Sequence, residues 1–395
     1  MYIQRKHYLE EIQSVIGKDI IKVLFGMRRV GKSTLLKQIQ AQLLEDGVAS
    51  DRIITINFEL LEFDDIRDYR VLNTYIEDRM VGNDTYYVFL DEIQEVEGFE
   101  RVVNSLHATG RAELFITGSN STLLSGELAT LLTGRFYSIE VLPLSFAEMY
   151  DYIPWPTREE KLRSFIRAGG MPGTLLYEDA PRVRNYLLDM YQSILLRDIV
   201  QRHAIRNIDL LKRFMQFIFA NCSQLFSAAS ISTYLKSEGR RFGRETIYQY
   251  LGAAKDAFLI HGVPRYDIRG KDVLKTNEKY FVNDLGFRSL FFDNEQDITQ
   301  ALENIVYLHL RGQRYEIFVG KVGDKEVDFI AQRGSEVCYI QVTYLLADST
   351  TIDREFAPLE AIDDNYPKMV ISMDPVNRSR GGIIHTHIID FLLET

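Results

Sequence analysis

The stretch Gly26-Met27-Arg28-Arg29-Val30-Gly31-Lys32-Ser33-Thr34 fits the phosphate-binding pattern G-x-x-x-x-G-K-[ST]. An apolar run at residues 20–25 precedes it and is typical of a buried strand. Apolar residues at helical spacing follow it from Leu35 onward and predict a helix. Strand, glycine loop and helix in this order are what the pattern needs, because backbone N–H groups then point at a phosphate. A glycine turn that matches by chance is the alternative interpretation.

The pattern assigns a role to each of its polar positions. Lys32 is expected to reach the β- and γ-phosphates, and the Ser33 hydroxyl is expected to bind Mg²⁺. The other phosphate-binding positions of this prediction are Gly26, Arg29, Val30, Gly31 and Thr34.

A second motif supplies acidic groups. Residues 86–90 are apolar, predict another buried strand, and are followed by Asp91 and Glu92. An Asp at the carboxyl end of such a strand can hold Mg²⁺ through water, and a Glu after it can polarise the attacking water. A solvated acidic turn is the alternative. The two motifs together predict binding of ATP or GTP with Mg²⁺, followed by hydrolysis.

Composition limits the classes of protein to consider. The 395 residues allow several domains, and no apolar stretch approaches the roughly 18 residues of a membrane span. The first residues have no apolar region after their charges, and two cysteines give no disulfide framework. We therefore expect a cytoplasmic protein without a membrane partner.

The net charge of −10 is unevenly distributed. Residues 151–300 have 22 basic and 18 acidic side chains, a net charge of +4, whereas residues 1–150 and 301–395 have net charges of −8 and −6. Only this middle third suits an anionic polymer such as DNA.

The pattern of apolar runs predicts four parts. Residues 1–150 alternate strands and helices, which predicts an α/β domain with a parallel sheet and flanking helices. Its expected strands are 20–25, 53–58, 86–90, 114–117 and 137–142. Residues 151–225 are expected to be helical, and residues 296–395 to form an α+β domain.

Residues 226–295 have the pattern of a winged helix. A short helix at 230–237 and a recognition helix at 244–251 would precede a β-wing made of residues 259–267 and 272–283. If this module binds DNA, the phosphate contacts would come from Arg240, Arg241, Arg244, Arg269, Lys271 and Lys275, with Tyr248 and Gln249 nearest the bases. Packing against another domain is an equally open alternative.

The tandem Asp91-Glu92 suits P-loop ATPases that place the catalytic Glu beside the Mg²⁺-binding Asp. The chain resembles, over nearly its whole length, the prokaryotic AAA+ ATPases with a C-terminal domain of formerly unknown function. The motifs that carry this resemblance are residues 26–34, 90–94, 117–120, 132–135, 169–172 and 327–329. The resemblance implies an AAA+ ATPase that uses ATP.

The resemblance also implies further catalytic roles. Ser119 or Asn120 would be the polar sensor at the end of the fourth strand, with a simple turn residue as the alternative. Asn57 would hold Glu92 inactive, or else make a strand-end hydrogen bond. Arg135 would be the finger that neutralises transition-state charge, acting in cis or on a neighbouring subunit of a homo-oligomer, with a surface arginine as the alternative.

The family's C-terminal domain resembles PD-(D/E)XK nucleases, which need acidic residues on a helix and two strands, and a lysine, to bind Mg²⁺ and activate water. This chain offers Glu303, Glu326 and Asp328, but has Gln341 in place of a carboxylate and Thr343 in place of the lysine. We therefore expect a nuclease-like fold with little or no cleavage.

Three functions follow. The first is an ATPase that drives a conformational switch, with possible coupling to DNA through residues 230–280. The second is a nucleotide-dependent DNA- or protein-binding module with slow turnover, and the third is an active DNA nuclease.

Overall fold

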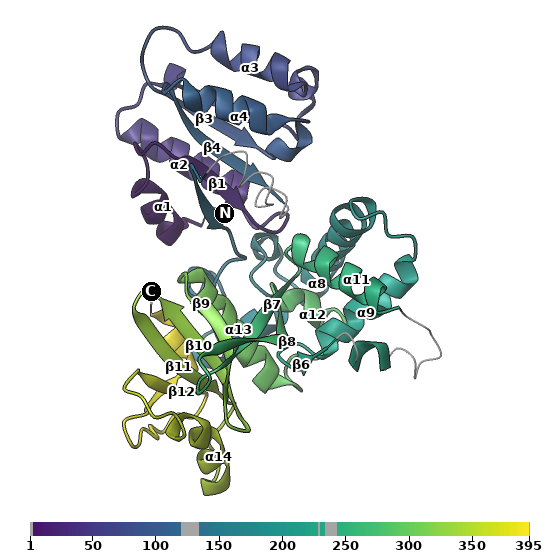
Figure 1. Cartoon of the computed structure of the whole chain (residues 1–395), viewed down its shortest axis with the longest axis vertical. Helices are drawn as coiled ribbons and strands as arrows, with labels where there is room; N and C mark the ends of the chain where they lie inside the picture. The colour runs from purple at the N-terminus through teal and green to yellow at the C-terminus, as the bar shows by residue number, and fades with distance from the viewer. Residues whose placement is uncertain (1–2, 120–133, 228–229, 234–242, 395) are drawn as a thin grey trace. The chain divides into compact units, whose positions relative to one another are not determined.

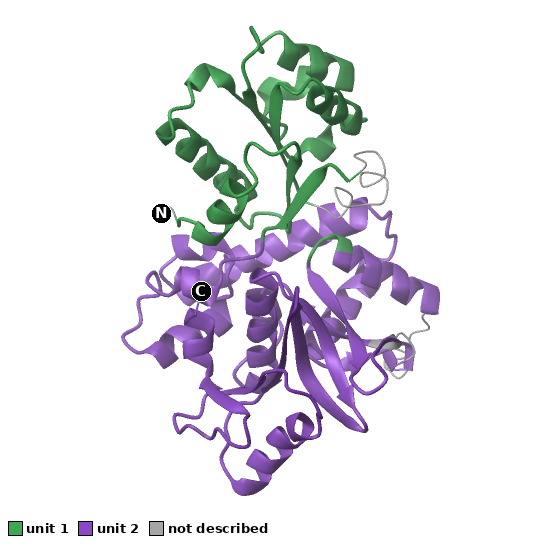
Figure 2. Ribbon diagram, turned by 60° about the vertical axis from the view of Figure 1, so that its left-hand side comes forward, with its two compact units in different colours: residues 1–141, 256–258 green, residues 142–255, 259–395 purple. Residues whose placement is uncertain are grey.

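The computed structural model describes residues 3–119, 134–227, 230–233 and 243–394 (Figure 1). The chain divides into two compact units (Figure 2). Unit 1 comprises residues 1–141 and 256–258, and unit 2 comprises residues 142–255 and 259–395.

Unit 1 contains a five-stranded sheet in the order β2-β3-β4-β1-β5, and every neighbouring pair is parallel. The strands are β1 (Ile21–Phe25), β2 (Ile53–Asn57), β3 (Tyr86–Asp91), β4 (Ala112–Gly118) and β5 (Phe136–Glu140). The helices are α1 (Lys6–Gln13), α2 (Lys32–Glu45), α3 (Tyr69–Glu77) and α4 (Phe99–Ala108). The predicted parallel P-loop sheet with flanking helices is confirmed, including all five expected strands.

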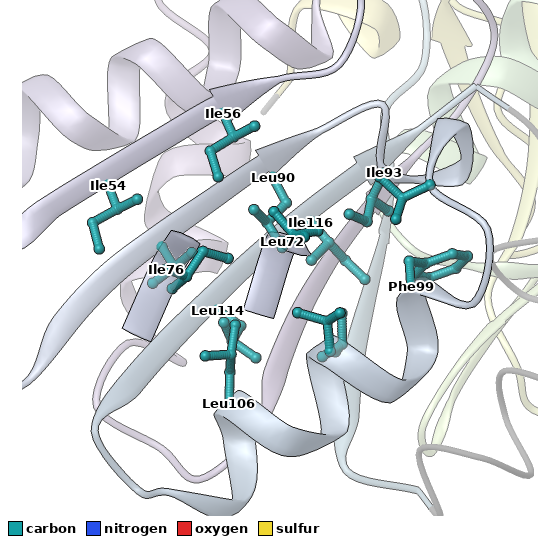
Figure 3. Close-up of a cluster of buried hydrophobic side chains, with 14 of the residues drawn as sticks. Ile54, Ile56, Leu72, Ile76, Leu90, Ile93, Phe99, Leu106, Leu114 and Ile116 are labelled. Atoms are coloured by element: carbon teal, nitrogen blue, oxygen red, sulfur yellow. The ribbon is translucent and has the colours of Figure 1, made fainter. Parts of the chain in front are cut away.

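The apolar side chains of one sheet face pack against α3 and α4 (Figure 3). Ile56 on β2, Leu90 on β3 and Ile116 on β4 are fully buried in this cluster, as is Leu106 on α4. Burying each such side chain contributes about 1.5–3 kcal/mol. The carboxyl ends of β3 and β4 are therefore held firmly beside each other.

Unit 2 begins with α6 (Phe146–Met149), and the expected helical segment then contains α7 (Arg158–Ala168), α8 (Ala180–Ser193) with a π-helical continuation (Ile194–Gln201), and α9 (Ile208–Ala220). α11 (Arg244–Asp256) lies at the place of the expected recognition helix. Thr157 and Glu160 form a capping box at the start of α7, which explains why the helix begins there.

The glycine motif at residues 169–172 packs closely against Asp284 and the following turn within unit 2. The N–H of Gly170 donates to Asp284 Oδ2 at 2.7 Å, and a side chain at Gly169 would overlap with Asp284. Gly169 also has a φ of 70°, which favours glycine. The motif therefore has a structural explanation and does not point to a ligand.

The remainder of unit 2 is built around one mixed eight-stranded sheet, in the order β13-β12-β11-β10-β9-β7-β8-β6. The strands are β6 (Leu225–Phe226), β7 (Ile260–Asp267), β8 (Asp272–Val282), β9 (Glu316–Val322), β10 (Lys325–Arg333), β11 (Glu336–Val342), β12 (Lys368–Ser372) and β13 (Ile384–His387). The helices are α12 (Leu285–Ser289), α13 (Ile298–Gly312), α14 (Ser349–Glu360) and α15 (Ile388–Leu393).

The two strands expected to form a β-wing are β7 and β8, which pair as an antiparallel hairpin, but β7 also pairs in parallel with β9. The hairpin therefore shares one sheet with the strands of the expected nuclease-like domain. The four-part division of the chain stays a prediction, since the structure groups all residues after Val141 except 256–258 into one unit.

Candidate functional site

The loop between β1 and α2 needs its two terminal glycines. Gly26 has a φ of 144°, and a side chain there would overlap with the carbonyl oxygen of Val141. Gly31 precedes α2 with a φ of 103°, and no atom lies within 4 Å of where its Cβ would be. The backbone therefore turns tightly at one end and is open at the other, as a phosphate-binding loop requires.

Lys32 starts α2, and its side chain is only 3% exposed. Its ammonium donates to the carbonyl oxygens of Gly26 and Met27, each at 3.1 Å, and lies 3.5 Å from Glu92 Oε1. Burial lowers the pKa of Lys32, and the nearby Glu92 and Asp91 offset this only in part. The buried positive charge is thus incompletely compensated, and an anion at the loop would stabilise it.

Asp91 ends β3 and is buried beside polar groups from two other elements. The Thr117 hydroxyl donates to Asp91 Oδ1 at 2.5 Å, and the Ser33 hydroxyl also hydrogen-bonds the carboxylate. Burial raises the pKa of Asp91, against the lowering effect of these hydrogen bonds. The structure therefore brings together Ser33 and Asp91, the two expected Mg²⁺-binding residues, and their oxygens suit this hard cation.

Glu92 has a left-handed backbone, with a φ of 54°. Its N–H donates to Thr117 Oγ1 at 3.0 Å, and Gln94 Nε2 donates to its Oε2 at 2.5 Å. Burial alone would raise the pKa of Glu92, but the charge of Lys32, the hydrogen bond from Gln94 and the nearby Ser119 hydroxyl outweigh it and hold the pKa below its usual value. The carboxylate is therefore ionised near neutral pH, as a general base must be.

The other expected residues fall in different places. Ser119 follows β4, is buried, and lies beside Glu92. Val30 is buried, and its carbonyl accepts from Arg5 at 3.3 Å, while Arg29 and Thr34 are exposed on the loop and first turn. Asn120 lies outside the described residues.

Arg135 is not brought to this site within unit 1. It is exposed and precedes β5, and its carbonyl oxygen accepts from the N–H of Ile21 at the start of β1. The P-loop follows the opposite end of β1. Five residues at about 3.3 Å each separate the two sheet edges by roughly 17 Å.

The role of Asn57 in holding Glu92 inactive stays a prediction. Asn57 Oδ1 accepts from the N–H of Glu59 at 2.9 Å, which is the strand-end hydrogen bond of the alternative interpretation. Gln94 contacts Glu92 instead. Sequence reasoning did not assign roles to Gln94 or Thr117, although both lie in the motifs that were recognised.

The residues of the expected nuclease-like centre also meet, around a lysine that the sequence did not single out. Lys279 Nζ on β8 lies 2.6 Å from Glu303, 3.2 Å from Glu326 and 3.3 Å from Asp328. Burial lowers the pKa of Lys279, but the three carboxylates outweigh burial and raise it above its ordinary value.

The two substituted positions of that centre have structural roles. Gln341 Nε2 donates to Glu355 at 3.3 Å, and its Oε1 accepts from the N–H of Asp328 at 3.4 Å. Thr343 is buried, and its N–H donates to the carbonyl oxygen of Ile371. Within the described ranges, no group of three or more His, Cys, Asp and Glu residues is arranged to hold a metal ion.

Some of the expected DNA-contacting residues are exposed. Arg244, Tyr248 and Gln249 are exposed on α11, and Arg269 and Lys271 are exposed at the β7–β8 turn. Arg240, Arg241 and the side chain of Lys275 lie outside the described part of the chain. No helix in that described part has the length and apolar character to cross a membrane.

Comparisons with known proteins agree with the nucleotide site. Residues 18–150 match the model of an AAA domain, and residues 159–297 match that of a domain of unknown function. An uncharacterized protein of Haemophilus influenzae is 37% identical over 399 residues, covering 99% of both chains. The uncharacterized protein MJ1544 of Methanocaldococcus jannaschii is 32% identical, covering 92% of this chain and 84% of its own.

Among solved structures, the chain is similar to the Walker-type ATPase PABY2304 of Pyrococcus abyssi, with 16% identity and a TM-score of 0.46 over 73% of this chain and 95% of that one. Cdc6p of Pyrobaculum aerophilum has 13% identity and a TM-score of 0.33, over 78% and 96%. Likeness at this level carries no argument about function.

Proposed function

Since the chain belongs to the same family as the Haemophilus influenzae protein and MJ1544, and has an AAA domain, we propose that it binds ATP with Mg²⁺ and hydrolyses it. The nucleotide domain of this proposal is residues 1–150. The observation that carries it is the incompletely compensated Lys32 ammonium beside an ionised Glu92.

Each residue of the site has a role in this proposal. Lys32 leaves the loop carbonyls for the β- and γ-phosphates, which releases Glu92 from its 3.5 Å ion pair to polarise the attacking water. Ser33 and Asp91 would hold Mg²⁺, which neutralises charge on the phosphate oxygens when bound. Gln94 orients the Glu92 carboxylate through its hydrogen bond, and Ser119 would be the sensor that contacts the γ-phosphate or the attacking water.

ATP turnover by the full chain tests the proposal. We expect Glu92→Gln to bind ATP but to lose most of its hydrolysis, because the amide cannot accept the proton of water. Glu95→Gln is the matched control, since Glu95 lies three residues away and is exposed. Equal turnover by wild type and Glu92→Gln would overturn the assignment.

The second part of the proposal is a conformational switch that couples the nucleotide to DNA through residues 230–280. The exposed Arg244, Arg269 and Lys271 support this part, because cations on a helix and a hairpin turn suit a phosphate backbone. We expect duplex DNA to bind weakly, with an affinity that falls steeply with salt, and to raise ATP turnover. If the protein does not bind DNA and its ATP turnover does not change when DNA is added, the ATPase proposal stands. α11 would then have a packing or protein-binding role.

The third part concerns Arg135. Its position at the amino edge of the sheet favours action on the nucleotide of a neighbouring subunit over action in cis. Mixing Arg135→Ala with Lys32→Ala tests this, because a mixed oligomer would contain intact composite sites. Recovery of turnover in the mixture supports a homo-oligomer, whereas full turnover by Arg135→Ala alone refutes the finger.

A further inference from the structure

Unit 2 contains a buried charge cluster formed by three elements. Lys279 comes from β8, Glu303 from α13, and Glu326 and Asp328 from β10. The Lys279 side chain is 3% exposed, and Glu303 and Asp328 are 11% and 8% exposed. Glu326 is 36% exposed, so three of the four side chains are buried and the fourth lies at the edge of the cluster.

The acidic members of this cluster are those of the expected nuclease-like centre, in which a divalent cation would be coordinated between a helix and a strand. Here one ammonium nitrogen lies within 2.6–3.3 Å of all three carboxylates. Oxygen ligands bind Mg²⁺ at about 2.0–2.1 Å and Ca²⁺ at about 2.3–2.6 Å. These distances are those of an ammonium ion in contact with carboxylates, and the contacts with Glu326 and Asp328 are longer than either metal makes.

We infer that the Lys279 ammonium permanently takes the cation position of this centre, so that the domain binds no divalent metal there and does not cleave DNA by metal-assisted hydrolysis. A dication entering between these carboxylates would lie within a few ångströms of a like charge in a poorly solvated place, which is strongly unfavourable.

The surrounding bonds support this closed state. Asp328 Oδ2 accepts from the N–H of Val342 at 2.9 Å, so its second oxygen is also engaged. Gln341, which stands where a carboxylate ligand is expected, is hydrogen-bonded to Glu355 and to the backbone of Asp328. The cluster is thus an ionic joint that ties the β7–β8 hairpin to β10 and α13.

The opposite interpretation is that Lys279 replaces the missing lysine at position 343 and acts as a catalytic residue. It requires a metal ion beside Lys279 and predicts Mn²⁺-dependent nicking of DNA that Asp328→Asn abolishes. The two interpretations therefore differ in a direct binding measurement.

Mn²⁺ binding to the full chain without nucleotide, followed by electron paramagnetic resonance, tests the inference. We expect the Asp328→Asn protein to bind Mn²⁺ as the wild type does. Any Mn²⁺ bound at the P-loop is identified by its loss in Asp91→Asn. We expect Lys279→Ala to gain a Mn²⁺ site with an affinity at least tenfold higher than any Mn²⁺ binding by unit 2 of the wild type. Adding Asp328→Asn to the Lys279→Ala protein should remove this site. Lys255→Ala is the matched control, since it breaks a different lysine–carboxylate pair, with Glu278.

Two results would overturn the inference. One is an Asp328-dependent Mn²⁺ site or DNA nicking in the wild type, a comparison that does not need Lys279→Ala to fold. The other is a folded Lys279→Ala protein, shown by a cooperative urea transition of the full chain, that gains no Mn²⁺ site.

Discussion

Two buried lysines, one in each unit, meet carboxylates and yet behave in opposite ways. Lys32 in unit 1 and Lys279 in unit 2 are each 3% exposed at the side chain. The pKa of Lys32 is lowered because burial outweighs Glu92 at 3.5 Å and the more distant Asp91. The pKa of Lys279 is raised because three carboxylates within 3.3 Å outweigh the same burial.

The comparison shows how burial alone fails to identify a binding site. A buried charge whose partners are mainly neutral carbonyls retains a tendency to bind a further ion of opposite sign. A buried positive charge surrounded by carboxylates is already compensated and has no such tendency to bind a further anion. Lys32 is therefore suited to a ligand, whereas Lys279 is suited to stability.

Replacing Lys279 gives the largest expected effect. Lys279→Met leaves buried carboxylates without their cation, and we expect it to reduce the free energy of unfolding by about 3–5 kcal/mol. Urea denaturation of the full chain measures the change, with the exposed Lys271→Met as control. If Lys279→Met loses no more stability than Lys271→Met, the contrast drawn between Lys32 and Lys279 is refuted.

Replacing Lys32 is expected to affect activity rather than stability. Lys32→Met removes the phosphate contact, so we expect ATP turnover to fall by about 10²–10³-fold. The denaturation midpoint should move little, because no carboxylate lies as close to Lys32 as Glu303 lies to Lys279. Steady-state phosphate release and a thermal melt measure the two effects, and a large loss of stability with normal turnover would reverse the assignment.

Gln94 offers a smaller test of the nucleotide site. Its hydrogen bond helps to lower the pKa of Glu92, so Gln94→Leu should raise that pKa. Because Glu92 must be ionised to act as a base, the acid limb of the turnover profile should then shift to higher pH, with the loss confined to acidic pH and little change near neutrality. A uniform loss without a shift would indicate a structural role only.

Glu303 gives the smallest effect, on the pH dependence of stability. Burial and Asp328 raise its pKa above the ordinary 4.5, against the effect of Lys279. Its contribution to folding is therefore complete at low pH and is lost as pH rises from 4.5 through the raised value of about 8. Denaturation curves from pH 5 to 9 should show a shallower decline for Glu303→Gln, and an unchanged slope would contradict this.

The parallel sheet and much of the nucleotide site could be predicted from the sequence, because both depend on local patterns. The five strands are short apolar runs, and Lys32, Ser33, Asp91 and Glu92 occupy fixed positions relative to strand ends. Gln94 was missed as the partner of Glu92 because side-chain direction after a strand depends on the left-handed backbone at Glu92.

Lys279 could not be predicted because its role depends on contacts between distant parts of the chain. It is 24 residues from Glu303 and 49 from Asp328, on a hairpin that was expected to belong to a separate winged helix. Only the parallel pairing of β7 with β9 brings that hairpin into the same sheet as β10. Sequence patterns within one element do not report such pairing.

The backbone at Glu92 has a consequence for how this position tolerates change. A left-handed conformation costs a residue with a side chain about 1 kcal/mol or more, and Gly and Asn adopt it most readily. A variant library sorted for heat resistance should thus enrich Gly or Asn at position 92, whereas one sorted for ATP turnover should retain Glu. If the two selections favour different residues at position 92, Glu92 is retained for ATP turnover although it lowers the stability of the fold.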